Sequence, residues 1–314
     1  MKHLRLIPDN TSIRFMAARR LTIPIALALV VASIVGYLVL GFNFGIDFTG
    51  GLTMQIHRTD GNADLAKVRH EIDALKLGDS QIQGIGGQTD VLIRLAEQPG
   101  GETAQQAAVA RVKTALGAEY TFLSVDVVGP AVSADLKFHA VVAVIVSLLL
   151  ILGYLWFRFE WQFAVGAVLT TIHDVILTLG VMAYFQISFD LPILAAILTI
   201  VGYSLNDTVV IYDRIREMLR KYKKMPIPEL IDRSINETLS RTVVTALTVF
   251  IASLSLFLFG GEALRGFSFI LVIGVLIGTY SSIVVSAPLL IFLHLRTSED
   301  KPVKPKEKTA SAKA

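Results

Sequence analysis

The sequence contains no cysteine and relatively few charged residues. None of its 314 residues is a cysteine, which excludes disulfide bonds, thiolate nucleophiles, cysteine-ligated zinc and iron–sulfur clusters. Charged residues make up 18% of the chain, against about 25% in an average soluble protein, and 53% of the residues are hydrophobic. Together with a mean hydropathy of +0.61, this composition excludes a soluble globular domain and indicates a protein that lies mostly in lipid.

Six apolar segments are long enough to cross a bilayer, which takes about 20 residues of helix. The first follows Arg19 and Arg20, as in a secretory signal peptide, but it exceeds the roughly 7–15 apolar residues of such a signal. We therefore expect an uncleaved anchor. The predicted spanning helices cover residues 21–42, 137–157, 162–185, 189–212, 243–260 and 266–294.

Lysine and arginine residues indicate the orientation of these helices, because basic loops stay in the cytoplasm. With the N-terminus inside, the predicted inside segments contain 20 of the 29 basic residues. We therefore expect a multi-pass protein with both termini in the cytoplasm. The inside segments are an N-terminal segment over 1–20, a short turn at Arg158, a cytoplasmic loop over 213–242 and a flexible basic tail over 295–314.

The region 43–136 between the first two spans has the residue pattern of a small α+β domain. Strand-like alternation and helix-like spacing follow one another in the order βαββαβ, which is typical of a ferredoxin-like fold. Gly86 and Gly87 suit the hairpin between the middle strands. The predicted strands cover 52–58, 80–85, 91–95 and 120–128, and the predicted helices cover 63–77 and 102–116.

Two aspartates stand out within the predicted spans, where ionisable side chains are functional candidates by default. Asp174 falls near the middle of the third span and Asp207 lies in the last part of the fourth. Because a carboxyl group can bind and release a proton, both residues suit a proton relay. Thr170 lies one helical turn before Asp174, and His173 precedes it directly.

Polar residues continue along the fourth span from Ser204 toward the cytoplasm. Tyr203, Asp207 and Arg214 share one stripe of the helix, and Asn206 and Asp213 form a neighbouring stripe. Asn206 and Thr208 could support the relay, or they could simply join helices through hydrogen bonds. We expect Asp213 and Arg214 to lie at a cytoplasmic interface, with an ion pair as one option.

Catalytic motifs are incomplete in this sequence. Gly202-Tyr-Ser204-Leu-Asn206 lacks the final glycine of a nucleophile elbow and lies within a span. His173-Asp174 has no second His–Asp cluster with which to complete a metal site, and no P-loop or H-E-x-x-H motif occurs. The sequence therefore predicts no enzymatic activity, no metal and no cofactor.

Two glycine motifs indicate shape rather than chemistry. Gly45, Asp47, Gly50 and Gly51 belong to a Gly-Ile-Asp-Phe-Thr-Gly-Gly sequence after the first span, which predicts a tight turn into the domain without a following helix. In the last span, the G-x-x-x-G of Gly274 and Gly278 predicts close helix packing, and Ser281, Ser282 and Ser286 extend its small-residue face.

Several motifs, in this order and at these membrane positions, resemble those of the SecF family of the bacterial SecDF protein-export complex, within the resistance-nodulation-division superfamily. The resemblance covers nearly the whole chain. The residues that carry it are 45–51, 128–130, 157–161, His173-Asp174, 202–217, 240–242 and 259–261.

The resemblance implies a subunit of the bacterial inner membrane that pairs with SecD, docks on the SecYEG translocon and contacts unfolded preprotein through its periplasmic domain. Proton movement would drive its conformational cycle, and nucleic acid would have no part. The implied relay residues are Asp174 and Asp207, supported by His173, Asn206, Thr208, Ser204 and Thr170. Because SecD carries an aspartate where this chain has Asn206, part of the relay would come from the partner.

Two other functions remain open from the sequence. A small-molecule exporter of the same superfamily is disfavoured, because the 43–136 domain offers little room for a drug pocket. A non-conducting assembly factor for the translocon would keep its aspartates paired and inert. The sequence also leaves open whether the coupled ion is H⁺ or Na⁺.

Overall fold

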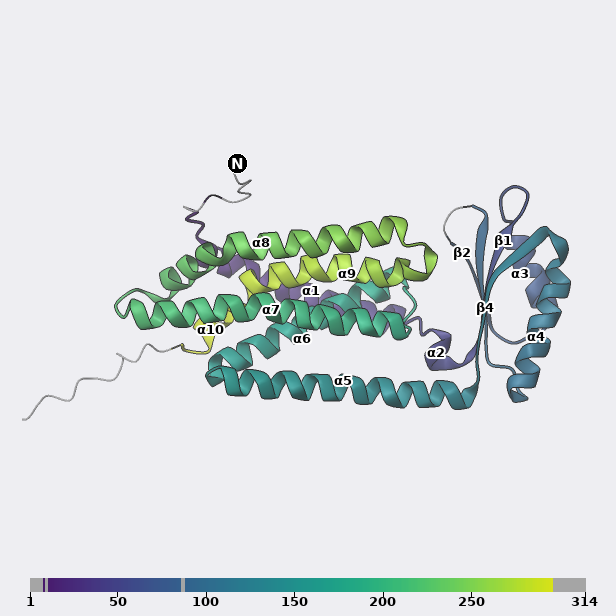
Figure 1. Cartoon of the computed structure of the whole chain (residues 1–314), viewed down its shortest axis with the longest axis horizontal. Coiled ribbons are helices and arrows are strands. Elements are labelled where there is room, and N and C mark those ends of the chain that lie inside the picture. The colour runs from purple at the N-terminus through teal and green to yellow at the C-terminus, as the bar shows by residue number, and fades with distance from the viewer. Residues whose placement is uncertain (1–7, 9–10, 86–87, 296–314) are drawn as a thin grey trace, which may run out of the picture.

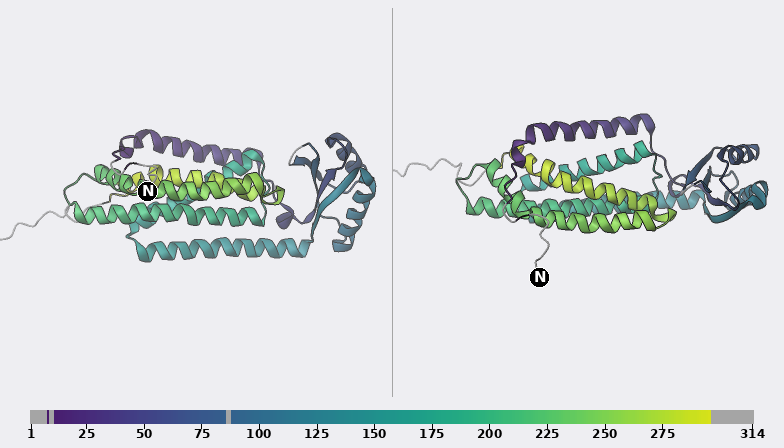
Figure 2. Two further views of the ribbon diagram at one scale, coloured as in Figure 1. Left: turned by 45° about the horizontal axis from the view of Figure 1, so that its top comes forward. Right: turned by 90° about the horizontal axis from the view of Figure 1, so that it is seen from above.

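The structure is a computed structural model that describes residues 8, 11–85 and 88–295. A bundle of long helices carries a small α+β domain at one end, and the chain crosses into this domain after α1 and returns through α5 (Figure 1). We call this end of the bundle the domain end and the other the far end. The N-terminal segment approaches α1 at the far end (Figures 1 and 2).

Six helices of the described chain are long and apolar enough to span a membrane, which confirms the predicted fold class. About half of α6 and α7 is buried within the chain, whereas only 6% of the α5 window is buried. The apolar side chains of α1 and α5 are therefore largely exposed, as suits helices surrounded by lipid or by another chain. The helices are α1 (Arg19–Leu40), α5 (Pro130–Arg158), α6 (Trp161–Phe185), α7 (Leu191–Lys221), α8 (Ile227–Phe259) and α9 (Glu262–Ser281), the last continued by η3 (Ser282–Ser286) and α10 (Ala287–Phe292).

The region expected as a cytoplasmic loop over 213–242 is almost entirely helical. Helix α7 continues to Lys221 and α8 begins at Ile227, so a short turn replaces most of the expected loop. The reason is a buried apolar face at helical spacing, which packs this segment onto the far end of the bundle. The buried residues of that face include Leu230, Ile231, Ile235 and Leu239.

Two other spans also differ from their predicted bounds. Helix α5 begins at Pro130, seven residues before the expected start at 137, and connects to strand β4 (Tyr120–Val128) through Gly129 alone. The last span is not a continuous α-helix, because η3 is a π-helical segment. π-helical turns occur frequently at functional sites.

The domain between α1 and α5 has the predicted ferredoxin-like topology. Its described strands form an antiparallel sheet in the order β2-β3-β1-β4, and two helices cover the face turned away from the bundle (Figure 1). Leu52, Met54 and Ile56 of β1 point into the core beneath these helices and are fully buried. The expected hairpin at Gly86 and Gly87 lies outside the described residues. The remaining elements are β1 (Gly51–Arg58), α3 (Leu65–Ala74), β2 (Ser80–Ile85), β3 (Asp90–Leu95) and α4 (Gly101–Leu116).

Candidate functional site

Asp174 lies fully buried at the contact of α6, α7 and α9. Its Oδ2 atom accepts hydrogen bonds from the Ser204 hydroxyl at 2.5 Å and the Ser281 hydroxyl at 2.7 Å. Its Oδ1 atom lies 2.9 Å from Nδ1 of His173. One carboxyl group is therefore joined to hydroxyl groups of two neighbouring helices.

Glycines of α9 allow this arrangement. A Cβ atom on Gly278 would lie 3.2 Å from the Cβ of Ser204, and one on Gly274 would lie 2.1 Å from the Cδ1 of Ile200. Helix α9 therefore packs closely against α7, as small residues at a membrane helix contact permit. This approach brings Ser204 and Ser281 to the same carboxylate oxygen.

The other predicted relay aspartate, Asp207, lies on α7 and faces α8. Its side chain is 2% exposed, and Oδ1 accepts a hydrogen bond from the Thr245 hydroxyl at 3.4 Å. Its Oδ2 atom has no hydrogen-bond partner within residues 11–85 and 88–295. Arg241 of α8 and Tyr203 of α7 lie close enough to interact with this carboxylate. Asp207 is therefore only partly satisfied by the described residues.

A series of hydroxyl groups lies between α7 and η3. The Thr208 and Ser282 hydroxyls are 3.1 Å apart, and Ser282 donates a hydrogen bond to the carbonyl oxygen of Ser204 at 3.3 Å. Tyr212 donates to the carbonyl oxygen of Ser286 at 3.0 Å. Because Ser204 also bonds Asp174, this series continues the polar contacts of Asp174 toward the far end of the bundle.

Three other predicted relay residues have contacts of different kinds. The Thr170 hydroxyl donates to the carbonyl oxygen of Gly166 at 2.9 Å and not to the Asp174 carboxylate. Asn206 is exposed on the outer face of α7, away from the buried polar groups. The second ring nitrogen of His173, Nε2, is buried and has no partner in the described part of the chain.

Asp213 and Arg214 do not pair with each other. Asp213 forms an ion pair of 2.6 Å with Arg158 at the end of α5. Arg214 forms ion pairs with Glu217 on its own helix and with Glu237 on α8. Because successive helical residues point about 100° apart, each reaches a different neighbouring helix.

The glycine motif after α1 forms the junction between this helix and the α+β domain. Within the predicted turn, α2 (Ile46–Thr49) makes one helical turn between Gly45 and Gly50, and strand β1, not a helix, follows the motif. Gly51 has φ +118°, and a Cβ atom there would lie 2.4 Å from the carbonyl oxygen of Leu95. The Asp47 carboxylate accepts a hydrogen bond from the backbone N–H of Leu191 at 3.0 Å, which joins the junction to the start of α7.

The sequence did not identify the residues of other helices that contact the predicted site residues. Ser281 appeared only as part of a small-residue face, and Thr245 and Arg241 were not singled out as site residues at all. Hydroxyl residues at small-residue positions of α9 were a usable signal, because they are common hydrogen-bonding groups between membrane helices. The pairing of Ser281 with Asp174 spans 107 positions in sequence, which no local pattern indicates.

The chemistry available at these positions is proton binding and hydrogen bonding. Across the described ranges, no three histidine, aspartate or glutamate side chains gather closely enough to hold a metal ion. The buried groups are instead carboxyls, hydroxyls and one imidazole. A carboxyl group that gains a proton becomes a hydrogen-bond donor as well as an acceptor, so each proton transfer changes its contacts with the neighbouring helices.

Comparison with known proteins gives a consistent result along the chain. The family model described as "Protein export membrane protein SecD/SecF, C-terminal" matches residues 108–296, and the one described as "SecD/SecF GG Motif" matches residues 38–57. The protein translocase subunit SecF of Cereibacter sphaeroides is 44% identical to this chain, over 92% of each. The protein translocase subunit SecDF of Brucella abortus is 43% identical over 95% of this chain, which spans only 39% of that longer protein.

A solved structure shows the same fold. The crystal structure of SecDF from Thermus thermophilus matches with a TM-score of 0.83 and 35% sequence identity, covering 93% of this chain and 40% of that one. Fold and site thus define a multi-pass membrane protein with a ferredoxin-like domain and carboxyl groups buried among its spanning helices. The chain belongs to the SecD/SecF family of protein-export membrane proteins, and it matches SecF-named members over most of their length.

Proposed function

We propose that this chain is the SecF-type subunit of a bacterial protein translocase and that it couples proton movement across the inner membrane to preprotein export. The main support for this proposal is that the Asp174 carboxyl group is fully buried and accepts hydrogen bonds from hydroxyl groups of α7 and α9. A charged residue at this depth is expensive, and in membrane proteins such residues mark ion pathways. Transfer of a proton to Asp174 would replace an acceptor by a donor and so change its bonds to Ser204 and Ser281.

The incomplete surroundings of Asp207 support a pathway that a partner completes. One of its carboxylate oxygens has no partner within the described residues, and Arg241 and Thr245 approach it from α8. Asn206 is exposed on the outer face of the same helix, where a second chain could reach it. We assign this partner to SecD, because the chain spans 39% of a SecDF relative in which both parts are joined.

In this proposal the ferredoxin-like domain lies in the periplasm and contacts emerging preprotein, while both termini and the far end lie in the cytoplasm. The clustering of lysine and arginine residues supports that orientation. Docking on SecYEG would place the domain near the exit of the channel. Two direct connections would carry a change from the relay to the domain: the hydrogen bond from Leu191 of α7 to Asp47, and the joint between α5 and β4.

The test is proton flux in proteoliposomes that contain this chain with its SecD partner under an imposed pH gradient. We expect Asp174→Asn and Asp207→Asn each to abolish flux while the complex still assembles. Asp213→Asn is the matched control, since Asp213 lies on the same helix as Asp207 but pairs with Arg158, and it should conduct normally. Wild-type flux in both relay variants would refute the proposal.

Two further arms of the experiment separate the alternatives. Repeating the assay with a sodium gradient tests whether H⁺ or Na⁺ is the coupled ion. Measuring preprotein export with and without a proton gradient distinguishes a motor from a non-conducting assembly factor, because the factor would support export equally in both conditions.

A further inference from the structure

A cavity of about 990 Å³ lies at the far end of the bundle, between the segment that leads into α1 and the beginning of α8. It is separate from Asp174 and Asp207, whose contacts are among α6, α7, α8 and α9. Its lining carries four arginines and three acidic residues. The charged lining residues are Arg14, Arg19, Arg20, Arg233, Glu229, Asp232 and Glu237.

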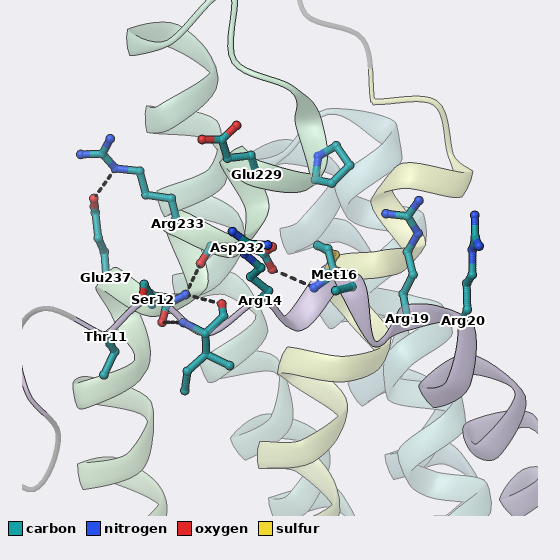
Figure 3. Close-up of a pocket in the computed structure, with 14 residues that line it drawn as sticks. Thr11, Ser12, Arg14, Met16, Arg19, Arg20, Glu229, Asp232, Arg233 and Glu237 are labelled. Atoms are coloured by element: carbon teal, nitrogen blue, oxygen red, sulfur yellow. Dashed lines mark hydrogen bonds and ion pairs between the residues drawn. The ribbon is translucent and has the colours of Figure 1, made fainter.

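Side chains of α8 hold the segment before α1 in place. Asn236 accepts a hydrogen bond from the backbone N–H of Ile13 at 2.9 Å and donates one to the carbonyl oxygen of the same residue at 2.8 Å. Asp232 accepts a hydrogen bond from the backbone N–H of Met16 at 2.8 Å (Figure 3). This two-point attachment fixes the backbone that carries Arg14, Arg19 and Arg20.

These three arginines form a basic group beside the cavity. Their side chains are directed away from the spanning parts of the helices, to the side on which Arg233 and Glu229 also lie (Figure 3). Among residues 11–85 and 88–295, Asp232 is near enough to interact electrostatically with Arg14 and Arg19, although it forms no direct ion pair of 4 Å or less with them. Asp232 is engaged by a backbone N–H, and Glu237 by Arg214 and Arg233.

The location of the cavity at the start of α1 indicates which kind of ligand would fit it. Helix α1 begins at Arg19, and its next turns expose apolar side chains, among them Leu21 at 67% and Ile25 at 46%. These apolar side chains lie outside the cavity lining, so only a ligand that extends from the arginines along α1 would contact both guanidinium groups and an apolar helix surface. Phospholipids with anionic headgroups have both complementary parts, and basic pockets between membrane helices bind such headgroups. A free phosphate would contact only the guanidinium groups and not the apolar side chains of α1.

We propose that Arg14, Arg19 and Arg20 bind the phosphate of an anionic phospholipid in the leaflet at the far end of the bundle. The guanidinium groups donate hydrogen bonds to the phosphate oxygens, a geometry that arginine satisfies in bidentate fashion. The acyl chains lie along the exposed face of α1. The bound lipid lies beside the attachments that Asn236 and Asp232 make to the segment before α1. This proposal is independent of the proton relay.

The test is native mass spectrometry of the full chain in detergent, titrated with palmitoyl-oleoyl phosphatidylglycerol and, in parallel, with phosphatidylcholine of the same acyl chains. We expect the wild-type protein to prefer phosphatidylglycerol. The variant Arg14→Gln/Arg19→Gln/Arg20→Gln should lose this preference, with an affinity for phosphatidylglycerol lower by about tenfold or more. Equal binding of both lipids by the wild type would overturn the proposal.

A matched control removes the same charge at the same end of the bundle. Arg220→Gln/Lys223→Gln/Lys224→Gln changes exposed residues at the end of α7 and in the turn to α8, and should keep the wild-type preference. If this control loses as much affinity as the triple arginine variant, the attraction is general and the site is refuted. Competition by inorganic phosphate as strong as by phosphatidylglycerol would assign the site to free phosphate and also overturn the proposal.

A second variant keeps the test decisive if the triple variant fails to insert. Arg14→Gln leaves Arg19 and Arg20 at the start of α1 unchanged, so the charge flanking this span remains. We expect its affinity for phosphatidylglycerol to fall about threefold. Wild-type affinity in Arg14→Gln would exclude this residue from the site and contradict the proposed three-arginine arrangement.

Discussion

The Asp47 carboxylate of the junction after α1 accepts a hydrogen bond from the backbone N–H of Leu191, the first residue of α7, at 3.0 Å. Asp190, directly before, caps the same helix by accepting from the N–H of Ile193 at 3.0 Å. Two carboxylates therefore satisfy N–H groups at the start of the helix that contains Asp207, where negative charge is favourable. One of them belongs to the segment that enters the domain.

Replacing Asp47 should loosen this connection. We expect Asp47→Ala to destabilise the chain by about 0.5–2 kcal/mol, the usual loss for a helix-capping side chain, and to speed amide exchange at residues 191–193. Thermal unfolding in detergent and hydrogen exchange measure the two effects. Asp47→Asn keeps an acceptor oxygen and should lose less; equal exchange in wild type and Asp47→Ala would show that the hydrogen bond does not hold α7.

The hydroxyls around Asp174 should contribute measurably to stability. Ser204→Ala and Ser281→Ala each remove one donor from a buried carboxyl, and we expect each to cost about 1–3 kcal/mol in unfolding experiments. Thr170→Val is the control, because it keeps the branched shape of this buried side chain and removes a hydroxyl that bonds the carbonyl of Gly166 on its own helix, so it should cost less. Equal losses in all three variants would indicate a general effect of removing hydroxyls.

A glycine of α6 should tolerate no side chain. A Cβ atom on Gly180 would lie 2.3 Å from the Cβ and 2.8 Å from the Cα of Ser33 on α1, so the backbones must separate. We expect Gly180→Ala to lower the unfolding free energy by about 1–3 kcal/mol.

Gly153 of α5 is the matched control for this substitution. Apart from its chain neighbours and the nearby backbone of its own helix, no described atom lies within 4 Å of a Cβ built there, and alanine favours helix more than glycine does. Gly153→Ala should therefore be neutral or stabilising by up to about 1 kcal/mol. Equal melting temperatures of the Gly180→Ala and Gly153→Ala variants would contradict the close contact of α1 and α6.

Asp190 should make stability depend on pH. Burial raises the pKa of its carboxyl above the ordinary 3.8, and the nearby Asp47 adds to the rise. The folded state therefore binds more protons than the unfolded state between 3.8 and the raised pKa, so the contribution of Asp190 to stability falls as pH rises through this window.

Asp190→Asn keeps a side chain that can cap α7 and removes the titration. We therefore expect the melting temperature of the variant, relative to wild type, to increase as pH rises through the window above 3.8 in which wild-type Asp190 loses its proton. A difference that is constant or that decreases with pH would contradict the raised pKa.

Local patterns in the sequence predicted the domain closely, because each of its elements has a clear period. Strand β2 has the predicted bounds Ser80–Ile85, and β4 has the predicted bounds Tyr120–Val128. Alternation of apolar and polar residues follows directly from one buried sheet face. The spans were also found, since their length and hydropathy are set by the bilayer.

Sequence patterns were less informative where contacts between distant residues decide the structure. The start of α8 was missed, because charged residues such as Arg233 and Glu237 lower the hydropathy while Leu230 and Ile235 still pack inside. The partners of Asp174 come from two other helices, so its hydrogen bonds depend on how the helices cross. The aspartates were identifiable as unusual, but their surroundings were not.

Helix α5 leaves strand β4 after a single glycine and runs for 29 residues, a length of about 44 Å. Little of it is buried against the rest of the chain, and in the proposed function it would act as a lever that pivots at Arg158, which is held by Asp213. A tilt of about 10° there would carry Pro130 about 8 Å sideways. In the proposed function, the displacement of the domain would then be set by the length of this helix, and the proposed relay groups would need to move by only a fraction of that distance.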